Sequence, residues 1–145
     1  MDNDPSGFIL NHLKKDLKQF EGLVHRTFNS TDICEFVGFL QRYYSRYKTL
    51  EDAFYNGMTS QNETVELGMI GFKRHFEDDL LFPKRSLKHI ASPDQNSACK
   101  RLNMFLRWMV RKDDGVDFGI WQEFNNPSLF ARWTFVCSAI HANSG

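Results

Sequence analysis

The sequence has little cysteine and no long apolar run. Its three cysteines, Cys34, Cys99 and Cys137, lie far apart, with neither a C-x-x-C motif nor a paired-histidine spacing. This pattern argues against a disulfide framework and a zinc site, and it fits a reducing cytoplasm. The absence of eighteen consecutive apolar residues argues against a membrane span, and the acidic first residues do not form a signal peptide. We therefore expect a cytoplasmic protein with no membrane contact.

An excess of charge is also missing. Eighteen Lys and Arg balance eighteen Asp and Glu, so the whole molecule exerts no strong attraction on nucleic acid or membrane. Any such binding must come from a local patch. The chain has no glycine-rich phosphate loop, no calcium loop, and no two histidines at a metal-ligand spacing. We expect no metal and no cofactor, and the oligomeric state stays open.

The chain is instead rich in aromatic residues, with fourteen Phe among 145 residues. A composition of 41% hydrophobic and 25% charged residues is typical of a globular protein, and the length fits one domain. Period-two alternation is missing, whereas helical periodicity recurs. We predict an all-α fold, an irregular bundle of about six to seven helices, in which residues 1–130 form a single domain and residues 131–145 a separate tail.

Local signals place the helices. Several side-chain oxygens in residues 28–32 can cap a helix that continues to Tyr47, and Thr49-x-x-Asp52 predicts a capping box for a short helix ending at Gly57. Two glycines in the next helix each cost about 1 kcal/mol relative to Ala unless close packing compensates. The later helices are predicted at residues 63–80, 83–90 and 96–111, and the two glycines are Gly68 and Gly71.

The helix at residues 96–111 separates apolar from basic residues. At 100° per residue, Lys100, Arg107 and Arg111 fall on one side and the apolar residues on the other. The apolar residues are Leu102, Phe105, Leu106, Met109 and Val110. We interpret the basic side as a phosphate-binding surface for DNA, and the free N–H groups at the helix start could add to it. Further candidates for this patch are Arg101, Lys112, Lys84, Arg85 and Lys88.

An ordinary amphipathic helix with a solvated charged face is the alternative for this segment. The acidic group Asp113-Asp114-x-x-Asp117 offsets part of the charge nearby, and we expect it to be solvated or to lie at a helix terminus. The three tryptophans could stack on bases, but each is expected to pack in the core. They are Trp108, Trp121 and Trp133.

Three strings carry a resemblance to a known family. Residues 8–12 read Phe-Ile-Leu-Asn-His and residues 20–28 read Phe-Glu-Gly-Leu-Val-His-Arg-Thr-Phe. The longest, residues 97–121, begins Ser-Ala-Cys-Lys-Arg-Leu-Asn-Met-Phe-Leu-Arg-Trp-Met-Val-Arg and ends Gly-Val-Asp-Phe-Gly-Ile-Trp. Over residues 8–124 the chain resembles a bacterial family known as a domain of unknown function. Full-length members of that family are similar to helix-hairpin-helix DNA glycosylases.

The resemblance implies a catalytic candidate. In glycosylases of this type, a Lys at the start of a helix attacks the sugar carbon, and a later Asp in a Leu-Asp-Val-His-like motif assists. Lys100 stands where that Lys would be. A phosphate contact or a solvated side chain is an equally good interpretation of Lys100.

The end of the chain departs from the family pattern. After Pro127 the family has its Leu-Asp-Val-His-like stretch, but this sequence has Phe130-Ala-Arg-Trp-Thr-Phe-Val-Cys137. Codons for Trp-Thr-Phe read one base earlier spell a Leu-Asp-Val-like string. We therefore predict that residues 131–145 are out of frame, that the catalytic Asp is missing, and that an N-terminal helical portion is absent.

These expectations leave three functions open. The first is a DNA-binding, glycosylase-like fragment with weak or no activity. The second is a non-enzymatic helical module that binds protein, and the third is a pseudogene fragment without a stable function.

Overall fold

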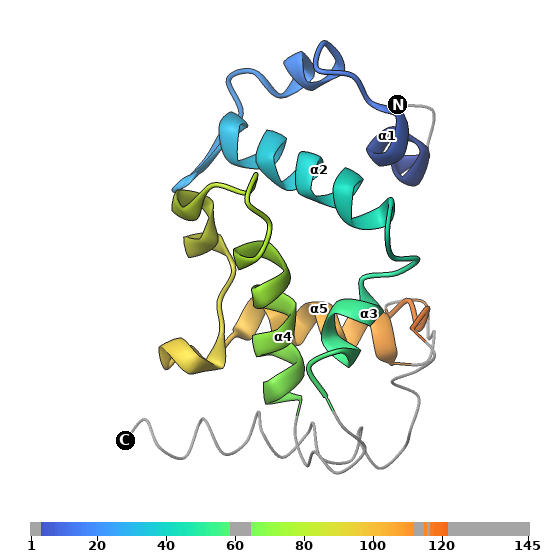
Figure 1. The fold of residues 1–145 in the computed structure, drawn as a ribbon, viewed down its shortest axis with the longest axis vertical. Helices are drawn as coiled ribbons and strands as arrows, with labels where there is room; N and C mark the ends of the chain where they lie inside the picture. The colour runs from blue at the N-terminus through green and yellow to red at the C-terminus, as the bar shows by residue number, and fades with distance from the viewer. Residues whose placement is uncertain (1–3, 59–64, 112–114, 116, 122–145) are drawn as a thin grey trace. The chain divides into compact units, whose positions relative to one another are not determined.

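The computed structural model describes residues 4–58, 65–111, 115 and 117–121 (Figure 1). This part of the chain contains five α-helices, three short 3-10 helices and one two-residue hairpin, so the predicted all-α class is confirmed. Its contacts divide the chain into two compact units, unit 1 (Met1–Thr49 with His75–Ile90) and unit 2 (Leu50–Arg74 with Ala91–Gly145). The expectation of a single domain stays a prediction. No helix within the described ranges is long and apolar enough to cross a membrane.

Unit 1 is organised around its longest helix. The elements in chain order are α1 (Pro5–Asn11), η1 (Asp16–Phe20), β1 (Val24–His25), β2 (Phe28–Asn29), α2 (Ser30–Tyr44), the end of α4 (Glu66–Glu77) and η2 (Lys84–His89). Helix α1 packs against α2, where Gln41 Nε2 donates to the Leu10 carbonyl at 3.0 Å. The hairpin pairs His25 with Phe28 in antiparallel register, and it is a small sheet that the periodicity does not predict.

The start of α2 follows directly from its sequence. The Asn29 side chain accepts from the N–H groups of Thr31 and Asp32, and the Asp32 carboxylate accepts from the Asn29 N–H at 3.0 Å. This reciprocal capping box satisfies N–H groups that the first helical turn leaves without partners. The helix start predicted at residues 28–32 is confirmed.

The capping box predicted at Thr49-x-x-Asp52 stays a prediction. Helix α3 (Glu51–Tyr55) follows Leu50, which already has helical backbone angles (φ −69°, ψ −13°) and makes no side-chain capping hydrogen bond. Because a capping residue has non-helical backbone angles, Thr49 occupies the position where such a cap stands.

Stacked aromatic rings fill unit 1. Phe39 and Phe76 lie parallel with their ring centroids 3.8 Å apart, and Phe82 packs edge-on against both. Phe39 is only 3% exposed. Aromatic pairs of this kind contribute about 0.5–1.5 kcal/mol each beyond the area they bury.

A buried carboxylate joins the two chain segments of unit 1. Ser86 Oγ donates to Asp32 Oδ1 at 2.9 Å, and Arg85 Nη2 lies 3.4 Å from the same oxygen. His89 Nε2 lies 3.4 Å from Asp32 Oδ2. Burial raises the pKa of Asp32, but the hydrogen bonds from Ser86 and the Asn29 N–H, with the charges of His89 and Arg85, outweigh it. The net pKa therefore lies below the ordinary value of an aspartate, which means that the native protein favours the ionised form.

Unit 2 contains α3, α4 (Glu66–Glu77) up to Arg74, η3 (Pro93–Gln95) and α5 (Lys100–Val110). Both long helices are shorter than the ranges 63–80 and 96–111 predicted for them, and residues 59–64 lie outside the description. Helix α5 begins only at Lys100 because Asn96 (φ 54°) and Cys99 (φ 47°) have left-handed backbone angles.

Close helix packing in unit 2 explains one of its glycines. A Cβ added at Gly71 would lie 2.9 Å from the Cα of Gly57, which follows α3. The backbone approach between α3 and α4 therefore requires a residue without a side chain, and this packing offsets the helix-propensity cost expected for Gly71.

Phe54 is the centre of the unit 2 core. It is fully buried and stacks on Phe72 with ring centroids 4.3 Å apart. Trp121 packs against Phe54 at 5.4 Å and meets Phe105 edge-on at 5.5 Å, so it connects α5 to this core. The prediction that Trp121 lies in the core is confirmed, and Trp133 lies outside the described residues.

Replacing Asp32 with Asn is expected to lower the free energy of unfolding at pH 7 by at least about 1.5–3 kcal/mol, the contribution of one hydrogen bond to a charged group. Because the pKa of Asp32 is lowered in the native state, its contribution is present above the unfolded pKa of about 4 and is lost as the pH falls through the native value. Chemical denaturation from pH 7 to pH 3 should therefore show the gap between wild type and Asp32→Asn closing below about pH 4.

Asp4→Asn is the matched control, because Asp4 is an exposed N-cap carboxylate whose bond to the Gly7 N–H an Asn can replace. An equal loss in both variants, or a gap that does not change with pH, would show that the Asp32 cluster contributes no special stability.

Candidate nucleic-acid interface

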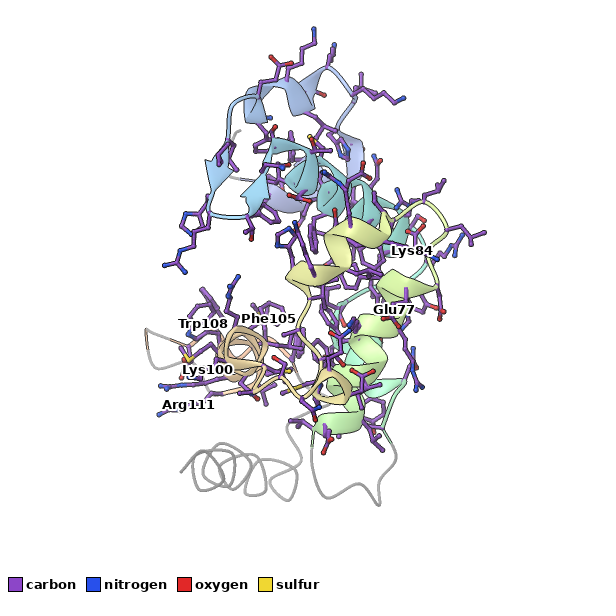
Figure 2. All side chains as sticks on the ribbon, turned by 90° about the vertical axis from the view of Figure 1, so that its left-hand side faces the viewer. Glu77, Lys84, Lys100, Phe105, Trp108 and Arg111 are labelled. Carbon is purple, nitrogen blue, oxygen red and sulfur yellow. The ribbon has the colours of Figure 1, made fainter. Side chains whose placement is uncertain are left out.

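Helix α5 presents cations and an aromatic residue on its exposed side. Lys100 and Arg111 lie on one side of the helix with Trp108, as Figure 2 shows in a view nearly along its axis. The exposed residues of α5 and its C-cap are Lys100, Arg101, Met104, Trp108 and Arg111, and the buried ones are Asn103, Leu106 and Val110. We call the exposed set, together with the half-exposed Arg107, the α5 outer face.

The buried side of α5 is rotated from the predicted apolar stripe. Leu106 and Val110 are buried as expected, but Phe105 is only half-buried and Asn103 takes a buried position. The Asn103 Nδ2 donates to the Ala98 carbonyl at 3.1 Å, so the amide closes the turn that precedes α5. Trp108, expected in the core, is 39% exposed.

A second buried carboxylate holds two cations of the α5 outer face. The Asp117 side chain has no solvent exposure, and its Oδ2 lies 3.5 Å from Arg107 Nε and 3.3 Å from Arg111 Nη1. Both arginine side chains keep about two fifths of their surface exposed. Of the two expectations for the acidic group, solvation is wrong for Asp117, because two guanidinium groups replace the water that a buried carboxylate loses. The other expectation, a helix terminus, fits Asp117, because its segment is hydrogen-bonded to the last turn of α5.

The segment that carries Asp117 is fixed by backbone hydrogen bonds to the end of α5. The N–H groups of Phe118 and Gly119 donate to the Trp108 carbonyl at 2.7 and 3.1 Å, and the Trp121 N–H donates to the Met109 carbonyl at 2.9 Å. These bonds satisfy carbonyls that the last turn of a helix leaves without partners. They also fix the backbone of Phe118 to that of Trp108. Phe118 is an exposed aromatic residue that the predicted site did not include.

The other predicted cations are not on α5. Lys84, Arg85 and Lys88 are on η2 in unit 1, where Lys84 and Lys88 are exposed and Arg85 lies beside Asp32. Lys112 lies outside the described residues. The prediction that these residues share one patch with α5 stays a prediction.

Lys100, the catalytic candidate, is exposed at the first residue of α5. A lysine nucleophile is activated by desolvation in an apolar pocket or by a neighbouring cation. Arg101 follows it in the sequence, but the exposure of Lys100 provides no such desolvation. No group of three or more His, Cys, Asp or Glu side chains that could hold a metal ion occurs in the part of the chain that the structure describes.

One family model matches the chain over residues 1–132, and it describes proteins of unknown function under the name DUF2400. The chain belongs to the DUF2400 family. The match is longer than the resemblance over residues 8–124, and it includes α5 and the segment that carries Asp117. No curated protein and no solved structure matches the sequence. The DUF2400 family has no assigned activity, and the α5 outer face is the feature of this chain that indicates a function.

Replacing Asp117 with Asn is expected to destabilise this DUF2400 protein by about 3–5 kcal/mol, as in other proteins where one partner of a buried ion pair is removed. Thermal unfolding followed by circular dichroism measures the change as a lower Tm. Asp94→Asn is the control, because Asp94 is exposed on η3 and the substitution changes the net charge by the same amount. Equal Tm values for the two variants would contradict a structural role for Asp117.

Proposed function

We propose that this protein binds DNA through the α5 outer face. The proposal is supported by four cations that lie along the whole length of one helix. The Asp117 carboxylate pairs with two of them. The eleven residues of α5 span roughly 16 Å at 1.5 Å per residue. Duplex DNA carries one charge per about 1.7 Å, so each cation can find a phosphate over that length. The four cations are Lys100, Arg101, Arg107 and Arg111.

Two of these cations are held in place before any partner arrives. Arg107 and Arg111 each direct a nitrogen at Asp117, while each side chain keeps about two fifths of its surface exposed. A guanidinium group has five N–H donors, so one group can contact a carboxylate and a phosphate together. Lys100 and Arg101 at the other end of α5 are exposed and complete the surface.

The resemblance to helix-hairpin-helix glycosylases supports DNA as the partner and raises the question of catalysis. We assign Lys100 to a phosphate contact and not to nucleophilic attack, because it lies in water at the start of α5. On this proposal the described part of the chain is a binding module.

A protein-interaction module is the second candidate, and exposed apolar side chains support it. Met104, Trp108, Phe118 and Ile120 are between 39% and 64% exposed in unit 2. An apolar partner surface would bind them with little dependence on salt, whereas displaced counterions make DNA binding steeply salt-dependent. Salt dependence therefore distinguishes the two candidates.

Fluorescence anisotropy with a labelled DNA oligonucleotide is expected to show an affinity that falls linearly in a plot of log K against log salt. The double variant Lys100→Gln/Arg101→Gln should make this slope shallower by about 1.4–1.8, since each lost phosphate contact removes about 0.7–0.9. This pair is chosen because Gln at Arg107 or Arg111 would also unbalance the buried Asp117. The double variant Lys14→Gln/Lys15→Gln, which leaves α5 unchanged, is the matched control, because Lys14 and Lys15 are exposed in unit 1. An unchanged slope in the α5 variant would overturn the proposal.

Borohydride reduction in the presence of a duplex with an abasic site is expected to trap no covalent adduct through Lys100, because that side chain is solvated. Mass spectrometry after digestion locates any adduct that forms. An adduct that disappears in the Lys100→Gln variant would contradict the assignment and make Lys100 a nucleophile, as the glycosylase resemblance implies.

A further inference from the structure

We propose that the α5 outer face takes unpaired DNA, with Trp108 as the platform on which a base stacks. The inference rests on the proposed DNA-binding function and names the form of DNA that it binds. Trp108 is 39% exposed between the two cationic ends of α5, whereas Trp121, the other described tryptophan, is 4% exposed. An indole at the surface presents a π-face on which any base can stack.

A second exposed aromatic residue is joined to α5 by the same backbone hydrogen bonds. Phe118 is 59% exposed, and its N–H donates to the Trp108 carbonyl at 2.7 Å, so its backbone is fixed to the turn of α5 that carries Trp108. The buried ion pairs of Asp117, the residue before Phe118, hold the same segment. Two joined segments thus each carry an exposed aromatic residue, at the end of α5 that carries Arg107 and Arg111, which suits a strand with exposed bases and charged phosphates.

The centre of the α5 outer face favours an unpaired base over a duplex. Bases in a duplex are already stacked on one another and show only their edges, which proteins read with amide, carboxylate and guanidinium groups. The arginines of this face can contact base edges or phosphates, so they do not decide between the two forms of DNA. Met104 and Trp108 lie at the centre, while the amide of α5, Asn103, is buried and donates to the Ala98 carbonyl. The exposed indole decides, because it can receive the face of an unpaired base.

The charge around Trp108 matches a polyanion. Stable protein interfaces bury about 800 Å² per partner, and their buried centres are depleted in lysine, although arginine and tryptophan are enriched there. Here the exposed tryptophan has three cations before it in α5 and Arg111 one turn after it; the three are Lys100, Arg101 and Arg107. A partner that offers π-faces along a line of negative charge matches this order.

The test compares a single-stranded oligo(dT) with a duplex of the same length at low salt, by fluorescence anisotropy on the whole chain. We expect the single strand to bind more tightly than the duplex. Trp108→Leu should weaken its binding by about fivefold to 150-fold, the range for losing one stacked base. Trp108→Phe, which keeps an aromatic face, should retain most of the affinity. Binding of oligo(dT) should also quench tryptophan emission, and Trp108→Phe should remove that quenching.

Any of the following results overturns the role of Trp108. The variants also show whether DNA binding by α5 fails at the same time. Equal affinity of wild type and Trp108→Leu for oligo(dT), with unchanged Tm, removes the stacking role. If Lys100→Gln/Arg101→Gln still weakens binding of the duplex, DNA binding by α5 stands without it. Tighter binding of oligo(U) than of oligo(dT) assigns the surface to RNA. Absence of binding to any of the three overturns both proposals.

Discussion

The buried carboxylate of Asp117 is the constraint on which the α5 outer face depends. Removing a carboxylate from water costs several kcal/mol, and that cost is offset only when cations with good geometry replace the solvent. Arg107 and Arg111 are four residues apart, so they project from neighbouring turns of one helix side and reach the same oxygen. The position of both arginines, and of the segment that returns beside Trp108, therefore follows from where this carboxylate is buried.

The same device occurs in each unit and explains how a neutral chain can present a cationic surface. Asp32 in unit 1 and Asp117 in unit 2 are both buried and both have basic partners that remain partly exposed. An acid placed inside the protein contributes less to the field at the surface than the cations that surround it. Net charge of the whole chain is therefore a poor guide to local binding, which depends on which charges reach solvent.

Much of the fold was accessible from the sequence because the relevant signals are local. Side-chain capping at residues 28–32 and helical periodicity along α2 and α5 act within a few residues, and the structure confirms both helices. Contacts between distant residues were not accessible in this way. Phe39 is buried by Phe76, and Gly71 is required by Gly57, although each pair is separated by more than ten residues along the chain.

The site shows the same division between local and distant signals. The cations at Lys100, Arg107 and Arg111 could be placed on one side of a helix by counting residues. Periodicity could not reveal that Asp117 turns inward or that Trp108 stays outside. Both depend on a segment that ends in Trp121, whose ring packs on Phe54, almost seventy residues earlier. An acidic residue three positions after two other acids resembles a solvated cluster until its basic partners are located.

Asp117 has opposing effects on binding of a polyanion, and their magnitudes decide between them. Its charge would repel a phosphate about 8 Å away by about 2 kcal/mol at an effective dielectric constant of 20, but two guanidinium groups largely cancel that field. Immobilising a flexible side chain on binding costs about 0.5–1.5 kcal/mol, and Asp117 has already ordered two arginines during folding. The saving for both side chains is about 1–3 kcal/mol. A carboxylate under a cationic surface is therefore compatible with binding DNA. It weakens the electrostatic attraction for phosphate, but it also holds the arginine side chains in position before binding.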